Sequence, residues 1–429
     1  MSELSMGTIV RLANNHYCTV QKELGRGGQG IVYQVDYQGK PFALKWYLAN
    51  PGQAFYTNLC KNAQQGAPSN HFIWPLLVTQ EYNGSFGYLM ELRPQGFADM
   101  SQFLLLKKQF KTVEAQLNAC LQICEAFKRL HANGYSYQDL NDGNFFINGD
   151  TGDVLICDND NVTSDKNNLG IIGKVGYLAP EIVESQCVPN KYTDYYSLAV
   201  CLFILIYMNR PFEGAKYLSC PCDNNPAFAA KLYGYESVFI MDPTDTSNRP
   251  VRGIHKNVIR RWTIYPEILR QAFCKTFSKE AQKDQTKRLM ESDWIKIILQ
   301  VRNLLVKCPE CGNPTFVGPS GSEPCVCAWC KKTPAISKYL KINGYNIPLT
   351  HGQKLYAVQT SDKKDFKEIA GETISKGGEL GLVNRSNESW SVSLPSGNKN
   401  LVAPGASMPA RDGFRILFGN QGNEGVING

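Results

Sequence analysis

The sequence has no apolar run long enough to cross a bilayer. Its longest apolar run covers residues 198–208, whereas a membrane-spanning helix needs about 20 such residues. Residues 1–7 also lack the basic and apolar regions of a secretory leader. We therefore expect the run to form a buried core helix, and we expect a cytoplasmic protein with no membrane segment.

Basic residues are only slightly in excess and do not gather in one stretch. The net charge is +7 over 429 residues, and the densest basic run, around Arg260 and Arg261, is short. A dedicated nucleic-acid binder usually carries a basic stripe on one face. The composition therefore predicts no nucleic-acid partner.

Cysteine is unevenly distributed along the chain. There are 15 cysteines, an odd number, and five of them lie between residues 308 and 330. This pattern favours a reducing compartment with one metal site over a framework of disulfides. Cys220 and Cys222 form a separate pair in C-P-C, for which two free thiols are favoured over a metal or redox role.

The chain divides into four zones, in line with the two to four domains that its length suggests. Residues 8–92 contain alternating, strand-like stretches such as 31–37 and 42–47, interrupted by one helix-like stretch at about 53–65. Residues from about 99 to 305 are rich in helix signals, including apolar residues at helical spacing over 117–130. Residues 306–333 form a compact cysteine segment, and 335–429 predict an all-β module.

A glycine-rich loop, G-R-G-G-Q-G at residues 25–30, lies between two of the strand-like stretches. Glycine allows the backbone to approach phosphates and to adopt positive φ at little cost. A Rossmann fold would require a helix after this loop, but the β-like I-V-Y-Q-V follows. Strand, glycine loop and strand is the order in protein kinases, and Lys45 in F-A-L-K stands where their next strand carries a lysine.

The middle of the chain carries acidic and amide residues at the spacing of a phosphoryl-transfer site. Asp139 and Asn144 are five residues apart, as in the D-x-x-x-x-N catalytic loop of kinases. A strand-like segment then leads to Asp158, which stands where kinases keep D-F-G. The order of these residues after Lys45 argues against four unrelated, solvated side chains.

Two further segments fit the same pattern. The A-P-E at residues 179–181 follows a glycine-containing segment, and Asp194 opens the apolar run. In kinases an aspartate at that place ties the buried helix to the catalytic loop. Arg288 is a candidate ion-pair partner for Glu181, although a surface arginine is an alternative.

On these motifs, residues 8–305 resemble the protein kinase superfamily. The resemblance implies an α+β bilobal fold with an N-lobe at 8–92 and a C-lobe at 93–305, followed by a zinc ribbon at 306–333 and a β-sandwich at 335–429. It implies an ATP- and Mg²⁺-dependent serine/threonine kinase with a protein substrate. The implied nucleotide-binding residues are Gly25, Gly27, Gly30, Val32, Ala43, Lys45, Glu91 and Phe146, the base is Asp139, and the Mg²⁺ ligands are Asn144 and Asp158.

A narrower resemblance is to bacterial kinases encoded beside von Willebrand-type and metal-dependent phosphatase genes in tellurite-resistance-like clusters. It is carried by F-I-W-P at residues 72–75, by the order of kinase and zinc ribbon, and by a tail similar to forkhead-associated domains. It implies a cognate phosphatase and a von Willebrand-type protein as partners.

The sequence departs from the kinase pattern around the expected phosphate site. No acidic residue lies between Lys45 and Glu81, so the helix glutamate that normally pairs with the lysine is missing. Asn58, Asn62 or Gln65 are candidate substitutes, although a neutral amide orients a lysine less strongly than a charged partner does.

The catalytic segments differ as well. Gln138 replaces the arginine of H-R-D, and Asn141 replaces the lysine that contacts the γ-phosphate in serine/threonine kinases. Lys174 stands where those kinases usually have a threonine, and we hypothesise that it reaches the γ-phosphate; a solvent-facing lysine is the alternative. Asp160 stands where D-F-G has glycine, and is expected to add a second carboxylate near the metals.

The cysteine segment has the spacing of a structural zinc site. Cys308, Cys311, Cys327 and Cys330 give C-x₂-C-x₁₅-C-x₂-C. Four thiolates leave no open position for water, so the zinc would be structural. Cys325 is a possible competing ligand.

The β module suggests a phosphopeptide site only by resemblance. Forkhead-associated domains bind phosphothreonine through loop residues, and Arg385, Ser386 and Asn387 are candidates here, but the G-R and S-x-x-H marks of that family are absent. A packing or docking sandwich without phosphate chemistry is the alternative. For the whole chain, the alternatives to a protein kinase are a nucleotide-binding scaffold and a small-molecule kinase. The sequence does not name the substrate or the oligomeric state.

Overall fold

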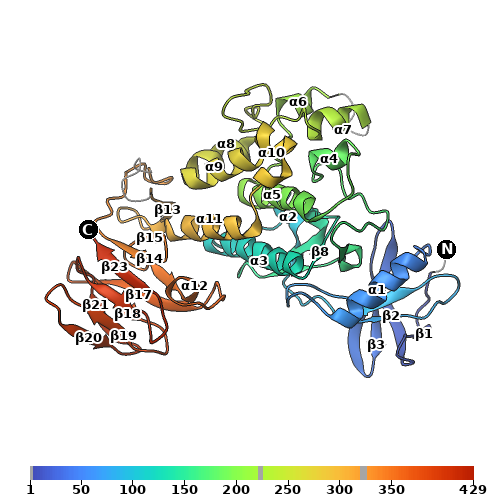
Figure 1. Cartoon of the computed structure of the whole chain (residues 1–429), viewed down its shortest axis with the longest axis horizontal. Helices are drawn as coiled ribbons and strands as arrows, with labels where there is room; N and C mark the ends of the chain where they lie inside the picture. The colour runs from blue at the N-terminus through green and yellow to red at the C-terminus, as the bar shows by residue number, and fades with distance from the viewer. Residues whose placement is uncertain (1–2, 221–225, 319–325) are drawn as a thin grey trace. The chain divides into compact units, whose positions relative to one another are not determined.

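The computed structural model describes residues 3–220, 226–318 and 326–429. It contains two compact units, Met1–Val251 with Lys275–Ser292, and Arg252–Cys274 with Asp293–Gly429. They are called the first and the second unit and are described separately (Figure 1). Cys222 and Cys325, which were considered above as a free thiol and as a competing zinc ligand, lie outside the described residues.

The first unit begins with a six-stranded antiparallel sheet in the order β1-β2-β3-β4-β6-β5. Alternating apolar residues of β3 and β4, among them the fully buried Trp46, form its core. Leu89 of β6 belongs to the same core and is also fully buried. The predicted strands at 31–37 and 42–47 and the predicted helix at 53–65 are confirmed. The elements are β1 (Ile9–Arg11), β2 (Tyr17–Arg26), β3 (Gly30–Tyr37), β4 (Lys40–Tyr47), α1 (Gln53–Gln65), β5 (Leu77–Val78) and β6 (Gly87–Met90).

The rest of the first unit is mainly helical. Residues 198–207 of the apolar run form the C-terminal part of α5, which is buried almost throughout, and Asn190 caps the start of the helix together with Thr193. The helices are α2 (Met100–Leu104), α3 (Val113–Ala132), α4 (Pro180–Val183), α5 (Lys191–Tyr207), α6 (Ala215–Leu218), α7 (Pro226–Tyr233) and α10 (Lys279–Lys283). Short strands and 3₁₀ turns complete it: β7 (Ala98–Asp99), β8 (Tyr135–Ser136), η1 (Asp142–Asn144), β9 (Phe145–Ile147), β10 (Val154–Ile156), η2 (Asn159–Asn161), β11 (Thr163–Ser164) and η3 (Gln285–Lys287).

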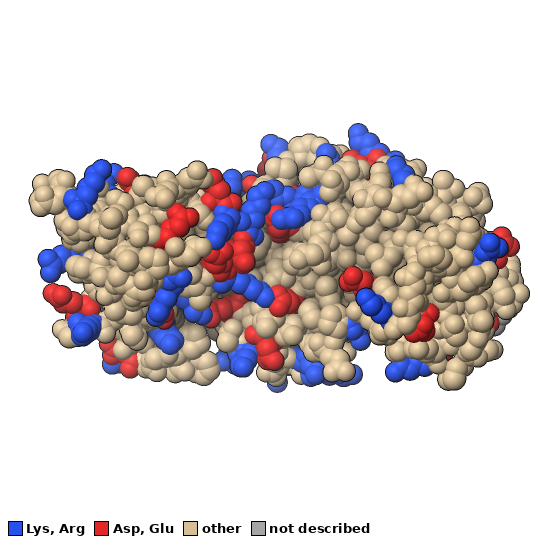
Figure 2. Space-filling model, turned by 90° about the horizontal axis from the view of Figure 1, so that it is seen from below, with Lys and Arg blue, Asp and Glu red and all other residues tan. Residues whose placement is uncertain are grey.

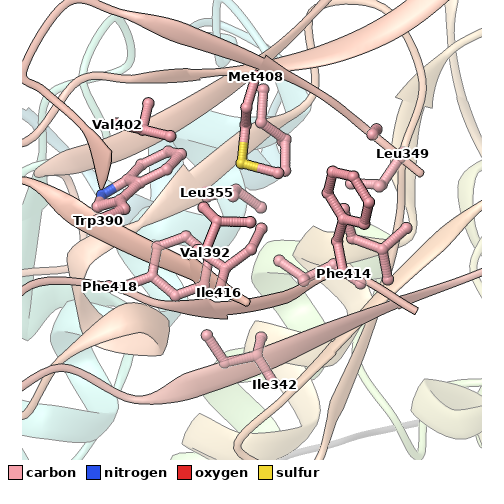
Figure 3. Close-up of a cluster of buried hydrophobic side chains, with 14 of the residues drawn as sticks. Ile342, Leu349, Leu355, Trp390, Val392, Val402, Met408, Phe414, Ile416 and Phe418 are labelled. Atoms are coloured by element: carbon pink, nitrogen blue, oxygen red, sulfur yellow. The ribbon is translucent and has the colours of Figure 1, made fainter. Parts of the chain in front are cut away.

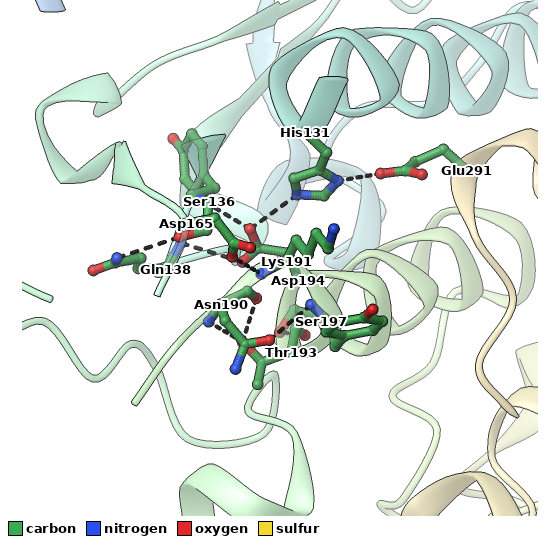
Figure 4. Close-up of polar contacts among 12 residues, drawn as sticks. His131, Ser136, Gln138, Asp165, Asn190, Lys191, Thr193, Asp194, Ser197 and Glu291 are labelled. Carbon is green, nitrogen blue, oxygen red and sulfur yellow. Dashed lines mark hydrogen bonds and ion pairs between the residues drawn. The ribbon is translucent and has the colours of Figure 1, made fainter. Parts of the chain in front are cut away.

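Asp194 at the start of α5 holds the loop that carries Asp139, as the sequence predicts. Its carboxylate accepts hydrogen bonds from the backbone N–H of Tyr137 at 2.6 Å and of Gln138 at 3.2 Å. His131 of α3 lies 3.0 Å from the same carboxylate and also contacts Glu291 (Figure 4). The loop is therefore fixed to the two buried helices of the unit.

The His131 cluster predicts a pH-dependent stability. Burial opposes the charge on this imidazole, but hydrogen bonds and charges from Asp194 and Glu291 outweigh it and raise its pKa to about 9. Because the folded pKa exceeds the unfolded value, the stabilisation is full below about pH 6.5 and is lost as pH rises through about 9. We expect His131→Asn to flatten the fall in unfolding free energy between these pH values, measured by urea denaturation, whereas His16→Asn at an exposed position should not. A steep fall that persists in His131→Asn would contradict this.

The second unit contains helices, a small hairpin and the all-β module. The helices are α8 (Lys256–Ile264), α9 (Glu267–Thr276), α11 (Glu291–Asn303) and α12 (Ala357–Thr360), of which the last two residues of α9 and the first two of α11 belong to the first unit. The hairpin strands are β12 (Leu305–Lys307) and β13 (Pro314–Phe316). The β strands are β14 (Tyr339–Ile342), β15 (Tyr345–Pro348), β16 (Lys354–Tyr356), β17 (Ile369–Lys376), β18 (Glu379–Asn384), β19 (Trp390–Ser393), β20 (Lys399–Val402), β21 (Ser407–Pro409), β22 (Arg415–Leu417) and β23 (Glu424–Asn428).

The β module is a sandwich of two sheets, which confirms the all-β prediction. One sheet has the order β15-β14-β23-β22-β19-β20 and the other β16-β17-β18-β21. Side chains from both sheets share one core (Figure 3), in which the rings of Trp390 and Phe418 meet edge to face at 4.9 Å. Leu355 and Met408 fill the core from the four-stranded sheet.

The end of α11 is anchored in this sandwich. Arg302 donates to the carbonyl of Phe366 at 2.6 Å, and its guanidinium lies 3.6 Å from the centre of the Tyr356 ring. Gln353 donates to the carbonyl of Asn303 at 3.1 Å. These contacts join the last helix of the helical region to the β module within one packed unit.

Lys and Arg side chains are interspersed with Asp and Glu on the face drawn in Figure 2. Within residues 3–220, 226–318 and 326–429, no helix has both the length and the apolar composition needed to cross a membrane.

Candidate active site

The glycine loop joins β2 to β3 and leaves its backbone open. Gly27 N–H donates to the carbonyl of Gly30 at 2.9 Å, closing the turn. A Cβ at Gly30 would lie 2.4 Å from the carbonyl oxygen of Trp46, so only glycine fits there. A Cβ at Gly25 would meet no atom within 4 Å. Gly30 thus allows two strands to approach, while Gly25 and Gly27 present accessible backbone.

Val32 and Ala43, two of the predicted nucleotide-binding residues, belong to one apolar cluster. Val32 packs against the buried cluster that contains Ala43, and Leu155 of β10 packs against the same cluster. Phe146 pairs with Leu155 across the β9–β10 ladder, and the Arg93 guanidinium lies 4.0 Å from its ring centre. Glu91 directly follows β6 and is exposed. The structure therefore gathers Val32, Ala43 and Leu155 in one apolar cluster.

Lys45 lies in β4, nearly buried, between two carboxylates. Its Nζ is 3.1 Å from Asp158 Oδ1, 2.8 Å from Asp160 Oδ2 and 3.1 Å from Asp160 Oδ1. Burial alone would lower the pKa of Lys45, but the charges and hydrogen bonds of both aspartates outweigh it and raise the pKa. The lysine is therefore held as a cation.

The predicted amide substitutes for the helix glutamate are wrong. Asn58 and Asn62 of α1 donate to the carbonyl of Val162, at 2.9 and 2.8 Å, and Gln65 accepts a hydrogen bond from the Tyr135 hydroxyl. The amide nitrogens of Asn58 and Asn62 and the amide oxygen of Gln65 are engaged with these groups. Lys45 is paired instead with the carboxylates of Asp158 and Asp160. Two features of the sequence accompany this pairing: helix α1 has no acidic residue, and Asp160 stands where D-F-G has glycine.

Asp158 and Asp160 differ sharply in exposure although they are two residues apart. The Asp158 side chain is 45% exposed and that of Asp160 is 0% exposed. Asp158 adopts the left-handed conformation, with φ 54° and ψ 41°, which Asp tolerates better than most residues. Asp158 can therefore face a ligand, and Asp160 cannot.

The catalytic-loop residues form one hydrogen-bonded group. Asn141 Nδ2 donates to Asp139 Oδ1 at 3.0 Å, and its backbone N–H donates to Asn144 Oδ1 at 2.8 Å. Burial raises the pKa of Asp139, the hydrogen bond from Asn141 opposes this, and the charge of Asp158 adds to the rise. Because an amide oxygen has two lone pairs, Asn144 can keep this bond and still ligate a metal.

Lys174 is held on one side of this group. Its Nζ lies 2.8 Å from Asp142 Oδ1, and Arg210 lies 3.6 Å from the other oxygen of the same carboxylate. The Lys174 side chain is 49% exposed. Asp142 was not predicted as a site residue, because its acidic type alone does not distinguish it from a solvated loop carboxylate.

The residues fit a metal-bound nucleotide. The glycine loop has accessible backbone, Lys45 is a fixed cation, and Asp158 and Asn144 offer oxygen ligands of the kind that Mg²⁺ prefers. Residues 18–289 match the family described as Protein kinase domain. The chain belongs to this family. The sheet-rich first lobe and the helical second lobe fit the bilobal architecture of a kinase domain.

Curated relatives share the kinase domain at low identity. The chain is 25% identical over 243 residues to Serine/threonine-protein kinase 16 of Rattus norvegicus, covering 49% of this chain and 75% of that protein. It is 25% identical over 245 residues to the Homo sapiens protein of the same name, with the same coverage. It is 28% identical over 221 residues to Eukaryotic translation initiation factor 2-alpha kinase 3 of Bos taurus, covering 44% of this chain and 20% of that protein.

The predicted ion pair between Glu181 and Arg288 is present in the kinase domain. Both guanidinium nitrogens of Arg288 lie 2.7 Å from the two carboxylate oxygens of Glu181, and Arg288 donates further to the carbonyls of Ala281 and Tyr192. The arginine side chain is completely buried. The alternative of a surface arginine is wrong.

The four predicted zinc ligands lie together in the second unit. Their sulfur atoms are all within 4.8 Å of one another, and the Cys308–Cys330 and Cys311–Cys327 pairs are 3.8 Å apart. A tetrahedral zinc with Zn–S bonds of about 2.3 Å has sulfur–sulfur edges of about 3.8 Å. The cluster therefore fits a closed zinc site.

Metal removal gives a direct test of this cluster. We expect about one zinc ion per chain, and chelation or Cys308→Ser should lower the thermal stability of the second unit, because a structural zinc contributes directly to folding. Zinc release can be followed with a chromogenic chelator and stability by circular dichroism. Cys187→Ser, at an exposed cysteine outside the cluster, is the matched control. A purified chain that is stable and zinc-free would contradict the prediction.

The candidate phosphopeptide residues are engaged locally. Arg385 pairs with Glu372 at 3.0 Å. The Ser386 hydroxyl donates to Asn384 Oδ1 at 2.7 Å and accepts from Trp390 Nε1 at 3.3 Å. The Ser386 hydroxyl therefore stabilises the local turn. A phosphate pocket formed by Arg385, Ser386 and Asn387 stays a prediction.

Proposed function

We propose that this chain is an ATP- and Mg²⁺-dependent kinase that transfers the γ-phosphate to a serine or threonine hydroxyl of a protein. The observation that carries the proposal is the grouping of Lys45, Asp158 and Asp139 in one kinase domain, with the lysine buried and the Asp158 carboxylate half exposed. The bound Mg²⁺·ATP supplies the transferable phosphoryl group and most of the charge neutralisation.

The residues act by positioning. Lys45 holds the α and β phosphates, and the accessible backbone of the glycine loop covers them. Asn144 and Asp158 hold the metal. Asp139 orients the substrate hydroxyl and accepts its proton, and its raised pKa keeps it closer to a usable base than a solvated aspartate would be.

The test is phosphate transfer from γ-labelled ATP with Mg²⁺, comparing the wild type with Asp139→Asn. We expect label on the protein or an added protein substrate with the wild type, and a loss of roughly 100- to 10,000-fold in the variant, with nucleotide binding retained. Tight nucleotide binding without transfer by the wild type would instead indicate a nucleotide-binding scaffold.

We also propose that Lys174 contacts the γ-phosphate. Its side chain is half exposed, and its charge is close enough to Asp139 to lower the pKa of that carboxyl. Lys174→Ala is expected to reduce kcat by about tenfold or more, since one charge-assisted contact is lost. Lys166→Ala, at another lysine of the same segment, should leave kcat unchanged. A wild-type kcat in Lys174→Ala would contradict the proposed contact with the γ-phosphate.

The accessory modules are proposed to recruit partners in the cytoplasm. Cys120, Cys124 and Cys201 are buried free thiols, which supports a reducing compartment. A structural zinc at the four cysteines would make the ribbon a rigid connection between the kinase domain and the β-sandwich. Proposed partners are a cognate phosphatase, a von Willebrand-type protein and, at the β-sandwich, a phosphopeptide.

A further inference from the structure

The ion pair that orients the nucleotide-binding lysine has moved to a different element in this chain. We propose that Asp160 is the positioning residue for Lys45, and that α1 supports the site through hydrogen bonds to the backbone of Val162. The inference rests on the proposed kinase activity and adds a residue that acts through Lys45.

The hydrogen-bond partners of the Asp160 carboxylate lie in the six-stranded sheet. Both of its oxygens accept from Lys45, at 2.8 and 3.1 Å. The Tyr47 hydroxyl donates at 2.5 Å and the Tyr88 hydroxyl at 3.3 Å. Tyr47 lies in β4 with Lys45, and Tyr88 lies directly opposite Lys45 in β6. A buried carboxylate needs such partners, because an unpaired charge in the interior is strongly unfavourable.

The hydrogen-bond partners of the two carboxylates separate this role from metal binding. Asp160 has no exposed side-chain surface, while Asp158 is 45% exposed and contacts Lys45 through one oxygen only. A metal ligand needs a lone pair that faces the ion. Asp158 retains an oxygen for that purpose, whereas the Asp160 oxygens face the lysine and the two tyrosines. The sequence led us to expect a second carboxylate near the metals at Asp160. We propose instead that this carboxylate positions Lys45.

Helix α1 holds the turn that carries Asp160. Asp160 lies in η2, and the carbonyl of Val162, which caps this turn, accepts from both Asn58 and Asn62. At the other side, Asn159 donates to the carbonyls of Ile73 and Ile156, at 2.7 and 2.9 Å. The turn is thus fixed at both ends. This explains how α1, which has no acidic residue, still contributes to holding Lys45.

A double-mutant cycle separates positioning from simple stabilisation. Lys45→Met, Asp160→Asn and the double variant are compared in kcat/KM and in the dissociation constant for Mg²⁺·ATP, with folding checked by near-UV circular dichroism. We expect Asp160→Asn to lower kcat/KM by about 100-fold, because a misplaced phosphate-binding group is costly for transfer. In the Lys45→Met background it should add less than about threefold, since the residue acts through Lys45. Tyr88→Phe, which keeps the carboxylate charge, should stay within about tenfold of the wild type.

Several outcomes would overturn the proposal. Equal losses from Asp160→Asn in both backgrounds would mean that Asp160 acts independently of Lys45. An additive loss together with a higher Mg²⁺ requirement would make Asp160 a metal ligand.

If Asp160→Asn does not fold, Asn62→Ala replaces it. We expect Asn62→Ala to lower kcat/KM by about tenfold in the wild type and not at all in the Lys45→Met background, and an additive loss would again overturn the proposal. If the wild type binds Mg²⁺·ATP but transfers no phosphate, the proposed activity fails, and the same cycle in nucleotide affinity still decides the role of Asp160.

Discussion

Replacing Asp158 by asparagine is expected to lower kcat for phosphate transfer by about 1,000-fold, while the chain stays folded. The carboxylate is half exposed beside Lys45, and we propose that it ligates the metal that is bound to the phosphates. A bound metal stabilises transition-state charge by several kcal/mol, and each 1.36 kcal/mol changes the rate tenfold. The measurement is the initial rate of label transfer from γ-labelled ATP as a function of Mg²⁺ concentration.

The matched control is Asp150→Asn, at an exposed carboxylate on the turn between β9 and β10. It should transfer phosphate at the wild-type rate, because it removes the same charge at a distance from the metal ligands. If Asp158→Asn kept the wild-type rate and the wild-type Mg²⁺ dependence, Asp158 would not be a metal ligand, and the assignment of the site would have to be changed.

Replacing Glu181 by alanine is expected to lower the free energy of unfolding of the first unit by roughly 3–5 kcal/mol. Glu181 is 7% exposed and pairs through both oxygens with Arg288, whose side chain is completely buried. The large effect arises because the substitution leaves the arginine charge buried without its carboxylate. Urea denaturation followed by tryptophan fluorescence measures the change.

Glu280→Ala provides the control for this prediction. Glu280 also pairs with a basic residue, Lys287, but at 3.6 Å and with both side chains more than half exposed. Exposed pairs contribute little to stability, so the denaturation midpoint should stay close to that of the wild type. Equal shifts in the two variants would show that the buried geometry of Glu181 has no special importance.

The order of motifs along the chain was sufficient to predict the kinase domain, because each motif combines residue type with spacing. The partner of Lys45 could not be predicted in this way. Asp158 and Asp160 are of the same type and two residues apart, and only the backbone direction at Asp158, with its positive φ, turns one carboxylate outward and the other inward. Spacing along the sequence carries no information about that rotation.

The cysteine cluster and the β module show the same contrast. The C-x₂-C pairs predict a common site because two residues between cysteines allow both sulfurs to reach one ion, and the four sulfurs do lie together. The loop of Arg385 and Ser386 offered only suitable residue types. In the structure the Ser386 hydroxyl is used by Asn384 and Trp390, which residue type alone could not reveal.

The most direct test of the central claim is to identify the products that the wild-type chain forms from Mg²⁺·ATP. Phosphate transfer predicts ADP in an amount that matches acid-stable phosphate on serine or threonine, located by mass spectrometry on this chain or on an added protein. Nucleotide that binds and is recovered unchanged as ATP, with no phosphate on any protein, would contradict the claim that this kinase domain is active.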